Sequence, residues 1–107
     1  MITVLDLRYG YESIDEAIHQ LLFSVASVCG SGGGILKIIH GERGRLPSAV
    51  RHELKGLKQR SKIMCAIYGE KLDSTDETVR YVCDKFPEFC KDTDYETKNA
   101  GITFACI

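Results

Sequence analysis

One carboxylate and one imidazole follow apolar segments that have the pattern of two strands. Asp6 lies near the end of residues 2–7, and His40 directly follows residues 35–39. If these strands are parallel neighbours, their carboxyl ends share the sheet edge where open α/β sheets bind ligands. A carboxylate beside an imidazole raises the imidazole pKa and fixes its orientation, which makes an acid/base pair for neutral pH. Asp6 and His40 are therefore the candidate catalytic residues. The alternative is that Asp6 pairs only with Arg8, on the same face of its strand.

The segment after His40 combines two glycines with two arginines. Gly41 and Gly44 provide a tight loop, and the helix expected after it presents free backbone N–H groups and a positive dipole end. Arg43 and Arg45 add guanidinium groups suited to bidentate phosphate contact. The loop lacks the Gly-Lys-Ser/Thr sequence of a P-loop, so hydrolysis of nucleoside triphosphates is disfavoured.

Positive charge is concentrated in one part of a chain whose net charge is only −1. Residues 37–62 carry eight basic and two acidic groups, whereas residues 63–96 carry four basic and nine acidic groups. In the basic segment, Arg51, Lys55 and Lys58 form a stripe beside the apolar face of a predicted helix. The stripe could follow a phosphate backbone, or it could be a solvated face balanced by acidic neighbours. If it binds phosphates, replacing Arg51 and Lys55 by alanine should flatten the salt dependence by about two units.

The apolar pattern predicts alternating strands and helices in one domain, because 107 residues are enough for one core. Strands are predicted at residues 2–7, 35–39, 62–69 and 102–107. Helices are predicted after the capping boxes Ser13/Glu16 and Ser74/Glu77, and from Pro47 as a first helical residue. The first strand, helix and strand imply a right-handed crossover between parallel neighbours. Residues 89–99 are polar and are expected to form a loop.

The cysteines are odd in number, and most of them lie in apolar or helical patterns. They are Cys29, Cys65, Cys83, Cys90 and Cys106. This usage is typical of reduced cysteines in a cytoplasmic protein. Cys83 and Cys90 are seven residues apart with no histidine nearby, so no metal site is expected there. The chain has no run of about 18 apolar residues, and we expect neither a membrane span nor a membrane partner.

Several of these segments resemble the Smr (small MutS-related) domain family. The matching segments are residues 4–8, the helix after them, residues 38–46, residues 49–51 and residues 101–104. The family's signatures are Leu-Asp-x-His at the end of the first strand and His-Gly-x-Gly-x-Gly at the start of the second helix. The resemblance covers most of residues 2–69 and 100–107. It implies a single Smr-like domain over residues 1–107, a divergent stand-alone member with a helical insertion at about residues 70–99.

The resemblance implies a two-layer α/β sandwich with a four-stranded mixed sheet, similar to the C-terminal domain of translation initiation factor three. Some family members nick DNA or cleave RNA, and others bind nucleic acid or ribosomes without established cleavage. This chain departs from the signatures at two points. Arg8 replaces the histidine after the aspartate, and the glycine loop is one residue short, with Gly44 as its last glycine. Arginine cannot transfer a proton, so the sequence favours binding over cleavage.

Three functions follow from these residues. The first is binding of the phosphate backbone of DNA or RNA, free or in the ribosome, by a set of cations and glycines. That set is Arg8, Gly41, Arg43, Gly44, Arg45, Arg51, Lys55 and Lys58. The second is an endonuclease in which His40 is the general acid/base and Asp6 orients it or holds Mg²⁺ or Mn²⁺. The third is a protein-interaction domain whose partner contacts the acidic insertion at residues 70–99.

Overall fold

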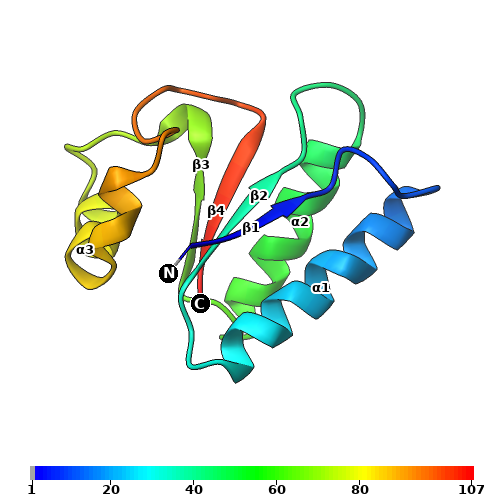
Figure 1. Ribbon diagram of the computed structural model, residues 1–107, viewed down its shortest axis with the longest axis horizontal. Helices are drawn as coiled ribbons and strands as arrows, with labels where there is room; N and C mark the ends of the chain where they lie inside the picture. Colours follow the sequence, from blue (N-terminus) through cyan, green and yellow to red (C-terminus); the bar gives the residue numbers. More distant parts are fainter. Residues whose placement is uncertain (1) are drawn as a thin grey trace.

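The computed structural model describes residues 2–107 and contains one four-stranded mixed sheet (Figure 1). The strands are β1 (Ile2–Asp6), β2 (Ile35–Ile39), β3 (Cys65–Tyr68) and β4 (Ile102–Cys106). The helices are α1 (Ile14–Gly30), α2 (Leu46–Gln59), α3 (Glu77–Lys85) and the short 3-10 helices η1 (Gly69–Lys71) and η2 (Pro87–Lys91). β1 and β2 are parallel neighbours, and β4 lies antiparallel between β2 and β3. The predicted parallel pairing of the first two strands is therefore confirmed.

Helices pack on both faces of the sheet, two of them on one face and the insertion on the other. α1 and α2 pack side by side on one face, where Leu36, Ile38 and Ala105 join their buried residues in one cluster (Figure 1). α3 and η2 lie on the opposite face, over a second cluster that includes Ile67 and Phe104. The predicted α/β sandwich is confirmed. The insertion adds cover over β3 and β4, whereas Val4 on β1 stays 59% exposed.

The insertion is anchored by an aromatic residue that the sequence pattern assigned to a loop. Phe89 lies in η2 and is fully buried, with its ring edge-on to Phe104 at 5.0 Å and to Tyr95 at 5.8 Å between centroids. The prediction of a polar loop over residues 89–99 is thus wrong at its start. Burying one phenylalanine in the sheet-facing cluster outweighs the polar composition around it.

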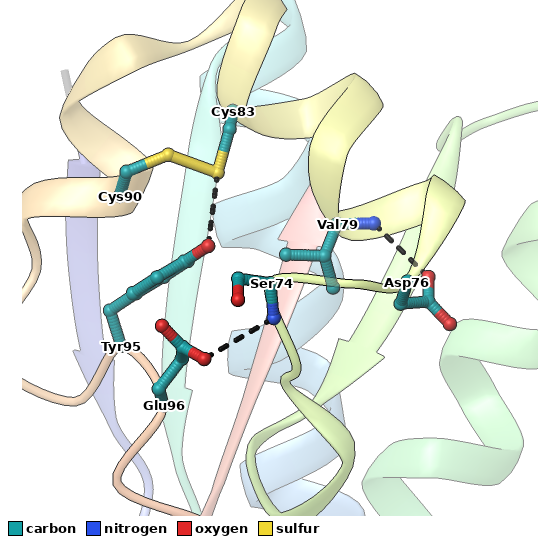
Figure 2. The surroundings of a disulfide bond; sticks show 7 residues. All are labelled: Ser74, Asp76, Val79, Cys83, Cys90, Tyr95 and Glu96. Carbon is teal, nitrogen blue, oxygen red and sulfur yellow. Dashed lines mark hydrogen bonds between the residues drawn. A yellow bond between two sulfur atoms is a disulfide. The ribbon is translucent and has the colours of Figure 1, made fainter.

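Cys83 and Cys90 form a disulfide that joins α3 to η2, beside the Tyr95 hydroxyl (Figure 2). The expectation that all the cysteines are reduced is therefore wrong for this pair. Spacing alone did not indicate it, because residues seven apart in one helix are too distant to bond. α3 ends at Lys85 before Pro87, and the chain turns back so that the two Cα atoms lie 5.6 Å apart.

Several of the predicted boundaries differ in detail, mostly by one residue. Ser13 caps α1 as expected, since its side chain accepts a hydrogen bond from the Glu16 N–H. Asp76, and not Ser74, caps α3: its carboxylate accepts hydrogen bonds from the N–H group of Thr78 and from that of Val79, the second of which is drawn in Figure 2. β3 has four residues, fewer than the eight predicted. None of the helices within residues 2–107 is long and apolar enough to cross a membrane.

Candidate nucleic-acid interface

His40 is buried at the end of β2 and is fully hydrogen-bonded, with only 2% of its surface exposed. Its Nδ1 lies 2.8 Å from the Gly41 carbonyl oxygen, which can only accept, so Nδ1 carries the proton. Nε2, 2.8 Å from Thr103 Oγ1, then accepts the Thr103 hydroxyl proton. Burial, with the nearby positive charge of Arg51 as a further cause, lowers the pKa of His40. The imidazole is therefore neutral and joins β2 to β4.

Asp6 does not meet His40, and the expected acid/base pair is wrong in this geometry. Asp6 is the register partner of Ile39, one residue before His40, and neighbouring residues of a strand point to opposite faces. The Asp6 carboxylate is exposed and binds the Arg8 side chain at 2.8 and 3.0 Å, which lowers the pKa of Asp6. The alternative that Asp6 pairs with Arg8 holds. Arg8 is thereby neutralised, although its side chain still lies against Gly41.

Arg51 forms an ion pair within the fold, which contradicts its assignment to an exposed phosphate-binding stripe. Its guanidinium donates two hydrogen bonds to the Glu70 carboxylate, at 2.6 and 2.7 Å, and one from Nε to Thr103 Oγ1 at 3.1 Å. The same guanidinium stacks 4.0 Å from the centre of the Tyr68 ring. This pairing lowers the pKa of Glu70. Glu70, Tyr68 and Thr103 were missed as partners. Only Thr103, a hydroxyl in an otherwise apolar strand, carried a signal in the sequence.

The loop between β2 and α2 keeps its cations free. Gly41 and Gly44 adopt φ values of +77° and +76°, a backbone conformation that residues other than glycine rarely adopt. Arg43 and Arg45 are exposed, and neither forms an ion pair with another residue of the described chain. Arg45 precedes α2 without a side-chain cap, and no acidic residue occupies the first turn of α2. The loop therefore presents two guanidinium groups beside an uncapped, positive helix end.

Lys55 and Lys58 extend this positive surface along α2. Both are exposed, and within residues 2–107 neither has an acidic partner at ion-pair distance. They line a groove of about 340 Å³ between α2 and β3, together with Arg51 and Lys71. Of the three residues in the predicted stripe, Lys55 and Lys58 are thus exposed, whereas Arg51 is partly buried. Among the described residues, no group of three or more His, Cys, Asp or Glu side chains could hold a metal ion.

Part of the acidity of the insertion has an internal cause. Lys37 on β2 is 6% exposed, and its Nζ lies 2.7 Å from an Asp92 oxygen and 2.6 Å from an Asp94 oxygen. Burial would lower the pKa of Lys37, but the hydrogen bonds to both aspartates outweigh it and raise the pKa. These two carboxylates therefore neutralise a buried lysine on the sheet, and are turned inward, away from any partner.

Comparisons of the chain with models of known protein families, with curated proteins and with solved structures found no match. The resemblance to the Smr domain therefore stays a prediction from the residues.

Proposed function

We propose that this protein binds the phosphate backbone of DNA or RNA, free or within the ribosome. The contacts are made by the loop of residues 41–45 and by the exposed lysines of α2. The proposal retains Arg43, Arg45, Lys55 and Lys58 as the binding cations, with Gly41 and Gly44 shaping the loop. It excludes Arg8 and Arg51, because carboxylates already neutralise both of them.

The contrast between paired and unpaired cations is the observation that supports this proposal. Arg8, Lys37 and Arg51 each hold a carboxylate, whereas the four cations of the loop and α2 hold none within the described chain. Phosphate contacts of this kind position a nucleic acid without reading its bases. Binding should therefore depend weakly on sequence and strongly on ionic strength.

Phosphodiester cleavage is not proposed, because Asp6 and His40 do not form an exposed acid/base pair. His40 is buried and uses both ring nitrogens within the fold, and Asp6 lies on the other face of the sheet. His40 instead positions the loop. Its backbone N–H and that of Gly41 both donate to the Gly101 carbonyl oxygen at 3.0 Å, which fixes the direction in which the loop leaves the sheet.

Replacing Arg43 and Arg45 together by alanine tests the proposal. We expect the double variant to bind labelled 20-nucleotide DNA and RNA at least about tenfold more weakly, because two charge-assisted contacts are lost. Fluorescence anisotropy with single strands and duplexes measures this. Lys91→Ala, which removes an exposed charge from η2, is the matched control and should bind as the native protein does. Equal affinities for all three proteins would contradict the proposal, and cleavage of the oligonucleotides with Mg²⁺ or Mn²⁺ would favour the endonuclease.

A further inference from the structure

β3 is an edge strand whose outer backbone groups face open space. In β4, the residues that bond to β2 alternate with those that bond to β3. Ile107 and Gly34 exchange both backbone hydrogen bonds at 2.8 Å, and Gly101 accepts from His40, so the odd-numbered residues of β4 pair with β2. The even-numbered residues pair with β3, where Cys65 and Ile67 are the partners of Cys106 and Phe104. The N–H and C=O groups of Ala66 and the N–H group of Tyr68 therefore point outward, whereas the Tyr68 carbonyl lies at the start of η1.

These outward groups form the floor of the groove beside α2. One wall is α2, which contributes Lys55 and Lys58, and Lys71 from η1 lies at the same site. The other wall is the start of α3, with Thr78 and Val79. The one carboxylate lining the groove, that of Asp76, is occupied in capping α3. The groove is thus positive on its α2 side, and on its α3 side the negative charge of Asp76 faces the N–H groups at the start of α3.

The backbone floor distinguishes between two kinds of anionic ligand. Phosphates accept hydrogen bonds but donate none, so a nucleic acid strand held by Lys55 and Lys58 at the rim would leave the Ala66 carbonyl on the floor of the groove unpaired and facing negative charge. An extended peptide supplies an N–H and a C=O in alternation and satisfies both kinds of group. The lysines then favour carboxylate side chains in that peptide.

We propose that this groove binds an extended acidic segment of a partner protein, which adds to β3 as a fifth strand. Alternate side chains of an added strand lie over opposite faces of the sheet. Ala66 packs with the cluster under α1 and α2, and Ile67 packs with the cluster under α3. The residues of the partner on the α2 side therefore meet Lys55 and Lys58 and are Asp or Glu, and those on the α3 side are apolar. The partner motif alternates acidic and apolar residues.

The test uses a fluorescein-labelled peptide of four Glu-Val repeats and measures anisotropy. We expect saturable binding that falls at least tenfold in Lys55→Ala/Lys58→Ala and in Ala66→Pro, and stays unchanged in Lys91→Ala. Proline at position 66 removes an outward N–H and leaves the bonds to β4 in place. A Lys-Val repeat peptide should not bind. Absence of binding by the Glu-Val peptide, or equal affinity for the Ala66→Pro protein, would overturn the proposal.

Two further peptides keep the test independent of whether Ala66→Pro folds. One is N-methylated on every Glu and the other on every Val, so each blocks the hydrogen bonds of one edge of the strand. One of them should lose binding to the native protein and the other should keep it; equal binding of both would exclude strand addition. Oligonucleotide binding separates this inference from the proposed function. Ala66→Pro should bind nucleic acid as the native protein does, and a loss of that binding would place nucleic acid in the groove instead.

Discussion

His40 has the sequence context of a catalytic residue and the surroundings of a structural one. A hydrogen-bonded chain runs from Arg51 Nε through Thr103 Oγ1 to His40 Nε2, and from His40 Nδ1 to the Gly41 carbonyl oxygen. Every member has a partner while the imidazole is neutral. A proton on Nε2 would reverse the Thr103 hydroxyl beside the positively charged Arg51, and so the network opposes protonation.

Stability should therefore fall in acid because of His40. The pKa of His40 is lowered in the folded protein from 6.5, so the unfolded chain binds the proton first. His40 then contributes stability that is full above pH 6.5 and is lost as the pH falls below 6.5 towards the folded pKa. The expected slope is at most about 1.4 kcal/mol per pH unit.

Urea unfolding of the native protein, His40→Gln and His52→Gln between pH 7.5 and 5 measures this contribution. His40→Gln should lose part of the acid destabilisation. His52 is exposed on α2, and the same substitution there should keep the native slope. If His40→Gln and the native protein have the same slope, His40 is not held neutral by the fold.

The sequence correctly predicted that Asp6 and His40 follow neighbouring parallel strands, but not the partners of their side chains. The face on which each side chain lies depends on register, and β1 is apolar on both sides, so alternation did not reveal it. Whether an arginine forms an ion pair depends on residues that are distant in the sequence, as Glu70 is from Arg51. Arg51 meets Glu70 and Thr103 only because β4 lies between β2 and β3.

At the scale of elements, the insertion covers the second face of the sheet, and its contact with the sheet includes ion pairs to Lys37. A lysine in the middle of β2 would be costly to bury alone, and Asp92 and Asp94 follow η2 so that both carboxylates reach it. The acidity of residues 70–99 was visible in the sequence, but its function was not. Phe89 and the Cys83–Cys90 disulfide, which hold η2 against the sheet and α3, belong to the same arrangement.

Removing only the two carboxylates that pair with Lys37 should lower the free energy of unfolding more than removing the carboxylates and the lysine together. Asp92→Asn with Asp94→Asn leaves Lys37 buried without an anion, and we expect a loss of about 3 kcal/mol in the free energy of unfolding. Adding Lys37→Met to the same protein should restore part of the loss, because methionine is apolar and of similar length. Chemical denaturation of the three proteins measures both steps. A loss that is unchanged by Lys37→Met would show that the aspartates act through something other than the lysine.

At the scale of the whole molecule, charge is sorted by the fold in a way that the net charge of −1 conceals. Carboxylates from the acidic segment of residues 63–96 neutralise Lys37 and Arg51. The other cations of the loop and of α2 stay exposed. The strand order could be predicted in part, since the first two strands and their helix have clear patterns. The position of β4 in the middle could not be derived from periodicity, and it creates the open edge at β3.

The salt dependence of nucleic-acid binding by the native protein tests the central claim most directly. Four unpaired cations that each displace one counterion predict that log K falls against log salt with a slope of about −3 for single strands and about −4 for duplexes. Anisotropy titrations between 50 and 200 mM KCl, with Lys55→Ala/Lys58→Ala reducing the slope by about two units, provide the measurement. A slope near zero, or one that the lysine variants leave unchanged, would contradict binding through the phosphate backbone.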